Sequence, residues 1–334
     1  MSTAKLHELG EEPIVASKIE ENLGVLRDNF FLEPDGHNVE ILVELIRHAL
    51  TTVIGHQGEG PVYPSSDRPH VAQIAKEAVI PEKMTLDPHE ILDSLPLHMQ
   101  GSVKASSPFM VKNIIPLPAF IHLATNLAVS LYMPNGVTGE DAAEVLNAEI
   151  ACASAIAKLA NLDPEKAGGV FTFGGTGTNL YGFKMGLHKA DPRHGMEGVS
   201  KDIVVVGSKP SHYSHQTAAN WLGIGQNNYL QVDSHLDQTT KLDELDAVCR
   251  NAIESGKKIA CIEALGGTTS NMAIDDFQAI CEIRDGLVSK YSLDYVPHIH
   301  ADTVLGWACK LPCGRDRRAF KERITWVGLK LCLD

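Results

Sequence analysis

Three segments of the sequence carry side chains that could do chemistry, and each follows an apolar run typical of a buried strand. The first is "FGGTGTNL" (173–180), where a glycine turn opens a helical pattern. The second is "PSHYSHQ" (210–216), with two histidines, and the third is "PHIHAD" (297–302), which ends on a carboxylate. Ligands of open parallel sheets bind beyond the carboxyl ends of the strands. The three segments therefore indicate one site at that edge.

The glycine turn favours an anion as its ligand. A helix that opens at Gly174, Gly175 and Thr176 directs bare backbone N–H groups and its positive dipole end toward whatever binds there. The turn is neither GxGxxG followed by an acidic ribose binder nor GxxxxGK[ST], so neither usual nucleotide motif fits. Glycine turns into helices are also frequently structural only. By itself the turn leaves the phosphorylated ligand unidentified.

The histidines and the carboxylate allow several interpretations. His212 follows a strand and could lie over an aromatic ligand, or it could be a surface-loop histidine bonded to backbone. A metal pair with His215 is disfavoured, because the spacing is three residues and no carboxylate stands nearby in the loop. Asp302 ends an apolar strand, where an unpaired carboxylate is expensive to bury. It is therefore expected to have a cationic partner.

Two further groups of residues allow a metal interpretation, but no metal site is predicted. His298 and His300 alternate along a strand and could face one way to bind zinc, as in a metal hydrolase. Such a hydrolase needs further His and Asp ligands at later strand ends, which the sequence does not supply. Cys309 and Cys313 could approach each other on a helix, but they form no CxxC pair.

The elements that must position these residues follow from hydrophobic periodicity. Helical spacing predicts helices over 37–56, 69–79, 117–133 and 138–161. The last of these opens with a capping pattern, Thr138 followed by Asp141. From about residue 88 loops are expected. Strands are predicted at 169–173, 202–208, 228–233, 258–265 and 297–302, alternating with helices. This alternation predicts an α/β fold with a mostly parallel sheet covered on both faces.

Composition excludes some classes of function. The chain has 29 basic and 42 acidic residues, a net charge of −13, and no basic stripe, so no nucleic-acid partner is expected. The sequence shows no signal peptide and no apolar run of membrane-spanning length. Seven cysteines without a CxxC pair are typical of reduced thiols. A soluble, cytoplasmic protein is therefore expected.

Taken in order, four motifs resemble a known family. They are "FGGTGTNL", "PSHYSHQTAANWLGIG", "EALGGTTSNMAIDDF" and "HIHADTVLGWA". Their order and spacing resemble the group II pyridoxal-phosphate-dependent amino-acid decarboxylases, which include glutamate, aromatic and diamino-acid decarboxylases. The resemblance implies a fold-type-I pyridoxal-phosphate transferase-like fold, pyridoxal 5′-phosphate as cofactor, an amino-acid substrate and a homodimer. It also implies an N-terminal helical segment at 1–100 and a cofactor-binding large domain at 101–334, without the family's small C-terminal domain.

The resemblance assigns roles to particular residues. Gly174, Gly175, Thr176 and Asn179 open the helix that cradles the cofactor phosphate. His212 resembles the family's histidine that stacks on the pyridine ring close to the reacting carbons. Asp302 resembles the aspartate that pairs with the ring nitrogen and keeps it protonated, and its pKa is expected to be lowered by that cation.

The sequence departs from the family at two places. Ala264 stands where some relatives carry a hydroxyl residue. The family's Schiff-base lysine lies in a "DSxxxDxHK" segment, which nothing up to Asp334 matches, and Lys330 stands in the wrong context. A truncated decarboxylase, inactive alone, is therefore expected. The alternatives are a non-catalytic or split-enzyme partner of the same fold, and a pyridoxal-phosphate-dependent carbon–carbon lyase.

Overall fold

The computed structural model describes residues 18–306 except positions 19, 22, 26, 29, 59, 63–70, 81–86, 106, 108, 111–116 and 161. The chain divides into two compact units, Met1–Ala119 and Phe120–Asp334. The predicted boundary between an N-terminal helical segment at 1–100 and a cofactor-binding domain at 101–334 stays a prediction. None of the helices in the described ranges is both long and apolar enough to cross a membrane.

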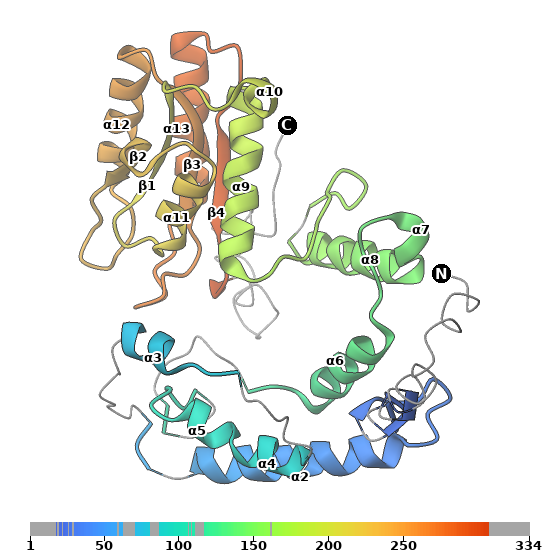
Figure 1. Ribbon diagram of the computed structural model, residues 1–334. Coiled ribbons are helices and arrows are strands. Elements are labelled where there is room, and N and C mark those ends of the chain that lie inside the picture. The colour runs from blue at the N-terminus through green and yellow to red at the C-terminus, as the bar shows by residue number, and fades with distance from the viewer. Residues whose placement is uncertain are drawn as a thin grey trace, which may run out of the picture. The chain divides into compact units, whose positions relative to one another are not determined.

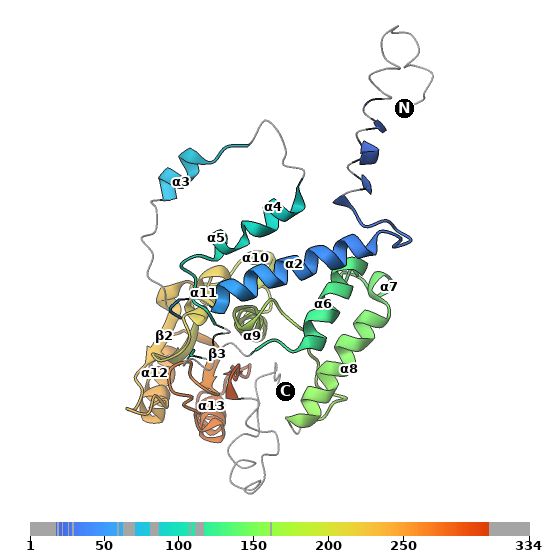
Figure 2. The same ribbon diagram turned by 90° about the horizontal axis from the view of Figure 1, so that it is seen from below.

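The first unit is helical. Its helices include α2 (Val39–Gly58), α3 (Val71–Glu77), α4 (Pro88–Asp93) and α5 (Leu95–Met99). The expectation of loops from residue 88 was wrong for α4 and α5. Asp87 caps α4 by accepting a hydrogen bond from the backbone N–H of His89 (2.9 Å), and Pro88 stands at the first helical position. Both α4 and α5 contact α2, and α4 runs beside it in both views (Figure 1 and Figure 2).

The second unit begins with three helices, α6 (Phe120–Tyr132), α7 (Gly139–Ala142) and α8 (Glu144–Leu159). The predicted cap is confirmed, since the Thr138 hydroxyl accepts a hydrogen bond from the Asp141 backbone N–H (3.2 Å). The single helix predicted over 138–161 is wrong. It is broken at Ala143, whose backbone φ of +41° cannot continue a right-handed helix.

A four-stranded parallel sheet forms the centre of the second unit (Figure 1). Its strands are β1 (Ile203–Ser208), β2 (Tyr229–Val232), β3 (Lys258–Leu265) and β4 (His298–Asp302), in the order β2-β1-β3-β4. The helices around it are α9 (Gly175–Ala190), α10 (His194–Glu197), α11 (Ser214–Trp221), α12 (Leu242–Glu254) and α13 (Phe277–Tyr291), with a 3-10 turn η2 at Gln226–Asn228. The predicted parallel α/β sheet is confirmed.

The strand predicted at 169–173 is wrong. This segment is irregular, and Phe171 and Phe173 are 57% and 71% exposed. The Phe171 backbone N–H donates to the Glu149 carboxylate (2.7 Å) rather than to a neighbouring strand. An apolar run becomes a strand only where another strand offers it backbone partners, and none in the described part of the chain does so here.

The two faces of the sheet have separate cores. The face toward α9 and α11 buries Phe183, Leu187, Ala190, Ile203, Val205, Ala218, Ala219, Ile224, Tyr229, Ala260 and Cys261. The face toward α12 and α13 buries residues that include Val204, Val206, Leu245, Ile262, Ala264, Phe277, Ile280, Leu287 and Ala301. Side chains alternate along a strand, so Glu263, His300 and Asp302 lie on the α9 face. The polar residues of interest therefore share one face.

Candidate functional site

The glycine turn at the start of α9 has the conformation expected of an anion-binding turn. Gly174 has a φ of +114°, which disfavours any side chain there, and α9 begins at the next residue. The first backbone N–H groups of any α-helix have no intrahelical acceptor. In α9 no side chain caps them, and the first turn carries no acidic residue. A Cβ on Gly175 would lie 3.1 Å from Val304 Cγ2. The turn therefore lies against the chain that follows β4.

Asn179, one turn into α9, joins the three segments that the sequence singled out. It is 2% exposed. Its Nδ2 donates to Asp302 Oδ2 (3.2 Å) and to Ser214 Oγ (2.9 Å), and its Oδ1 accepts from His300 Nε2 (2.7 Å). One buried amide thus connects the helix after the glycine turn, the segment at 210–216 and the end of β4.

Asp302 is a charged carboxylate at the carboxyl end of β4, with a side chain that is 14% exposed. Burial by itself would raise its pKa. The positive charges of His215 and His300 and the hydrogen bonds from Asn179 and the Val304 N–H (3.3 Å) outweigh burial, so the pKa of Asp302 is lowered. A basic side chain beside it is that of His215, whose Nε2 lies 3.5 Å from Asp302 Oδ2.

His215 stands between two carboxylates and is fully buried. Its Nδ1 donates to the carbonyl oxygen of His212 (2.9 Å), because a carbonyl can only accept. Its Nε2 lies 3.1 Å from Glu263 Oε1, in an electrostatic contact without hydrogen-bond alignment. In the protonated ring Nε2–H faces both Glu263 and Asp302. The loop itself carries no carboxylate, as the sequence indicated, and the two carboxylates beside His215 come from β3 and β4.

Glu263 is a buried carboxylate in the middle of β3 that the sequence analysis missed. Tyr229 donates a hydrogen bond to its Oε2 (2.7 Å). Burial raises the pKa of Glu263 to about 6, although His215 and Tyr229 act to lower it. Gly207 on β1 leaves room for the carboxylate, since a Cβ there would clash with it and with the Tyr229 hydroxyl. The signal in the sequence was the one acidic residue inside the apolar run "KIACIEAL".

His212 is half-buried and tied to the same edge of the sheet. Its Nδ1 accepts from the Ser214 backbone N–H (3.3 Å) and lies 2.8 Å from Ser214 Oγ. Ser214 Oγ also accepts from Asn179. The His212 ring is tilted by 36° against the Tyr213 ring, with 4.2 Å between centroids. Because Nδ1 is an acceptor, the neutral His212 ring carries its proton on Nε2.

The strand histidines are used in packing and in hydrogen bonding. His300 is bonded to Asn179, and Gly182 gives its ring room, since a Cβ there would lie 2.6 Å from His300 Cε1. Burial and nearby positive groups lower the pKa of His298 to about 3. Within the described ranges neither histidine belongs to a group of three or more potential metal ligands. Cys309, Cys313 and Lys330 lie outside the described residues.

Fold and geometry together define an α/β protein whose sheet edge carries a glycine turn that opens a helix and a carboxylate with a lowered pKa. Residues 74–327 match the family model described as the pyridoxal-dependent decarboxylase conserved domain. The chain therefore belongs to the pyridoxal-dependent decarboxylase family, and this family uses pyridoxal phosphate. The resemblance carried by the four ordered motifs is confirmed.

Curated relatives are identical to this chain at somewhat more than a quarter of the aligned positions. It is 27% identical over 203 residues to a glutamate decarboxylase-like protein of Gibberella zeae, covering 60% of this chain and 39% of the relative. It is 28% identical over 204 residues to an acidic amino acid decarboxylase of Xenopus tropicalis, covering 59% and 39%. The chain thus spans about two fifths of the length of these relatives.

A solved structure shows the same fold. The glutamate decarboxylase domain of a diaminobutyrate-pyruvate transaminase and L-2,4-diaminobutyrate decarboxylase from Vibrio parahaemolyticus superimposes with a TM-score of 0.67. The match has 22% sequence identity and covers 85% of this chain and 62% of that one. The expected fold-type-I α/β class is confirmed.

Proposed function

We propose that this chain binds pyridoxal 5′-phosphate at the carboxyl edge of its sheet and serves in the α-decarboxylation of an L-amino acid. The observation that carries the proposal is the position of Asn179, which bonds both to Asp302 and, through Ser214, to the segment of His212. Asn179 thus connects the two residues proposed to contact the cofactor ring. It lies on α9, the helix whose first turn is proposed to bind the cofactor phosphate.

The residues at this edge fit such a ligand. The first turn of α9 offers backbone N–H groups and no competing acid, which suits a phosphate. Asp302 is charged yet partly exposed, which suits a protonated ring nitrogen. The hydroxyls of Ser208 and Thr303, at the ends of β1 and β4, are buried without a hydrogen-bond partner among the described residues. Unpaired buried hydroxyls at this edge are consistent with a polar ligand there.

Each residue would have a distinct task. Backbone N–H groups at Gly175 and Thr176, with the Thr176 hydroxyl, would bind the phosphate, and His212 would lie over the ring. Asp302 would hold the proton on the ring nitrogen, and Asn179 would orient that carboxylate. When bound, the cofactor supplies an electron sink for the electron pair that remains at Cα as CO2 leaves.

The buried charges behind Asp302 would keep it ionised. His215 lies between Asp302 and Glu263 and acts to lower the pKa of both carboxyl groups. An ionised Asp302 is the form that can hold a proton on the ring nitrogen. His215 and Glu263 are therefore positioning residues in this proposal, since neither is proposed to touch the cofactor.

A second part of the proposal concerns what these 334 residues do without a further polypeptide. None of them stands in a motif like that of the cofactor-binding lysine. We therefore expect this polypeptide to bind the cofactor without a covalent bond and to turn over little substrate by itself. An acidic amino acid is the substrate class to try first, since two of the similar relatives carry glutamate or acidic amino acid in their names. A cytoplasmic homodimer is proposed by the same resemblance.

A titration with pyridoxamine 5′-phosphate tests the cradle directly. This form of the cofactor carries an amine in place of the aldehyde, so it cannot form Schiff bases with surface lysines. We expect one equivalent to bind to the full chain, and pyridoxamine without the phosphate to bind far more weakly. D302N should weaken binding by about 10- to 100-fold, in line with about 1.5–3 kcal/mol for a hydrogen bond to a charged group. D294N, on an exposed loop, is the matched control.

A second readout separates the two parts of the proposal. After incubation with pyridoxal phosphate and reduction with borohydride, the intact mass should show no stoichiometric adduct. An adduct at one mapped lysine would contradict non-covalent binding but keep the cofactor assignment. Failure of wild-type protein to bind pyridoxamine phosphate, or equal binding by D302N, would overturn the cofactor assignment for this polypeptide.

A further inference from the structure

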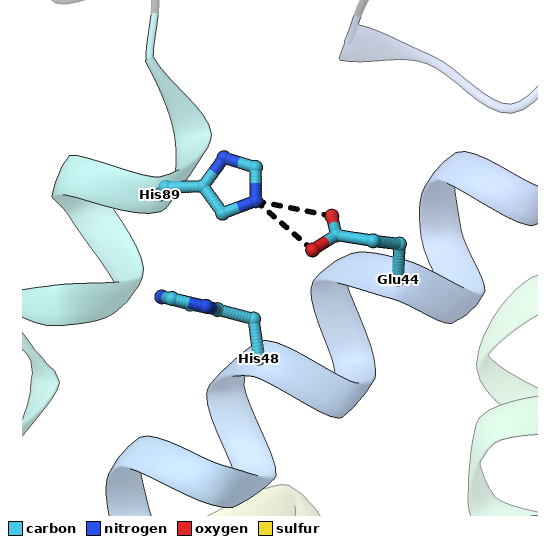
Figure 3. A group of neighbouring side chains, drawn as sticks. All are labelled: Glu44, His48 and His89. Atoms are coloured by element: carbon cyan, nitrogen blue, oxygen red, sulfur yellow. Dashed lines mark hydrogen bonds and ion pairs between the residues drawn. The ribbon is translucent and has the colours of Figure 1, made fainter.

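A second cluster of titratable side chains lies in the first unit. It consists of Glu44 and His48 on α2 and His89 on α4, here named the α2–α4 cluster. Glu44 and His48 are four residues apart, so they lie on one face of α2. Figure 3 shows His89 reaching from α4 toward Glu44, with His48 one turn further along α2.

The donor atoms of the cluster are already close together. One ligand atom from each of its three residues lies within 4.8 Å of the other two. His89 Nε2 lies 3.1 Å from both carboxylate oxygens of Glu44. Ligand atoms around a tetrahedral zinc ion, with bonds of about 2.0–2.2 Å, are separated by about 3.4 Å. The Glu44–His89 edge is therefore close to the spacing that a metal ion imposes.

Each histidine of the cluster also has a second carboxylate beside its ring. His48 Nε2 lies 2.6 Å from Asp93 Oδ1, and His89 Nδ1 lies 3.3 Å from Asp87 Oδ1. Metal-binding histidines almost always donate the N–H of the other ring nitrogen to a carboxylate or carbonyl, which fixes the ring and makes the binding nitrogen more basic. Asp93 and Asp87 are placed to do this and leave His48 Nδ1 and His89 Nε2 to bind.

The two imidazole rings of the cluster lie close together. The His48 and His89 centroids are 4.9 Å apart, with the rings nearly perpendicular at 83°. Together with the short separations between the donor atoms, this places both imidazoles and the Glu44 carboxylate at one point of the contact between α2 and α4.

From these observations we infer that the α2–α4 cluster is a divalent transition-metal site of the zinc type, with Glu44, His48 and His89 as ligands and water completing the coordination. Two imidazoles and one carboxylate favour zinc over magnesium or calcium, which prefer oxygen ligands alone. A bound ion would join α4 to α2. The inference goes beyond the proposed decarboxylase function and departs from the expectation that the chain has no metal site. Glu44 and His89 are 45 residues apart in the sequence, so no local spacing of ligand residues indicated the site.

Zinc binding by the full chain, stripped of metal with a chelator, tests the inference. Wild-type protein is titrated with Zn²⁺ against a chromophoric competitor, and the stoichiometry is read for each variant. We expect E44Q, H48A and H89A each to lose one zinc equivalent. H37A is the matched control, because His37 is an exposed histidine of the same unit that also contacts a carboxylate, Asp35. It should keep the full stoichiometry.

Further measurements keep the inference falsifiable. D93N should leave the zinc equivalent in place but weaken it by about 10- to 100-fold, as loss of a carboxylate behind a metal-binding histidine does. Cobalt(II) in the site should give visible bands without thiolate charge transfer, which excludes the cysteines. E44Q preserves size and helix propensity, so it reports on the site even if a histidine variant fails to fold. Unchanged stoichiometry in E44Q, or equal loss in H37A, would overturn the inference.

Discussion

Replacing Glu263 by glutamine should change how the stability of the protein depends on pH. Glu263 is fully buried beside His215, and burial raises its pKa from the ordinary 4.5 to about 6. A carboxyl whose pKa is raised on folding stabilises the fold while it is protonated. Its contribution is present in full below pH 4.5 and is lost as the pH rises through about 6. Glutamine keeps the shape of the side chain and does not titrate.

The size of the effect follows from the pKa difference. One pKa unit corresponds to about 1.4 kcal/mol, so a rise from 4.5 to about 6 is worth roughly 2 kcal/mol. Between pH 4 and pH 7 the free energy of unfolding of the wild type should therefore fall by roughly 2 kcal/mol relative to that of E263Q. Asp302, whose lowered pKa acts in the opposite sense, is present in both proteins and largely cancels in the difference.

Urea unfolding of both proteins across this pH range measures the difference. E140Q, which replaces an exposed carboxylate of the same unit, is the control for the effect of a glutamate-to-glutamine substitution as such. A wild-type minus E263Q difference that is flat from pH 4 to pH 7 would refute the reasoning. It would mean that Glu263 titrates in the folded protein as it does in the unfolded chain.

Three further predictions concern packing, buried charge and capping. G182A drives a Cβ into a buried histidine ring and should lower the free energy of unfolding by about 1–3 kcal/mol, whereas G195A meets open space and should not, as urea unfolding will show. H215L leaves two buried carboxylates without their basic neighbour and should lower the free energy of unfolding by about 3–5 kcal/mol. The double variant H215L/E263L should recover part of this loss. If the effects of the two substitutions simply add, the charge pairing is contradicted. D276A removes the cap of α13 and should cost about 1 kcal/mol by thermal unfolding, while an unchanged Tm would contradict that role.

Much of the fold could be predicted because its signals are local. Buried parallel strands are continuous apolar runs, and "KIACIEAL" matches β3 at both ends. The Thr138 cap was equally local. The errors arose where local signals were incomplete. The run at 169–173 is apolar but has no strand to pair with, and Ala143 breaks a helix that the periodicity carried through.

The candidate site shows the same division. Gly174, Thr176, His212 and Asp302 were selected because each stands at the end of an apolar run or opens a helix. Glu263 was missed because its partners, His215 and Tyr229, lie 48 and 34 residues away in the sequence. No local pattern reveals which distant side chain will neutralise a buried charge.

The sequence by itself determined the parallel α/β architecture, the family and the residues at the strand ends, because hydrophobic periodicity and ordered motifs are properties of neighbouring positions. Only the tertiary structure decided how those residues are connected. It placed Asn179 between Asp302 and Ser214, set His215 between two carboxylates, and brought His89 to Glu44. The physical reason is that hydrogen bonds and charge pairing act over a few ångströms in space, and the packing of helices on the sheet and on one another sets those distances.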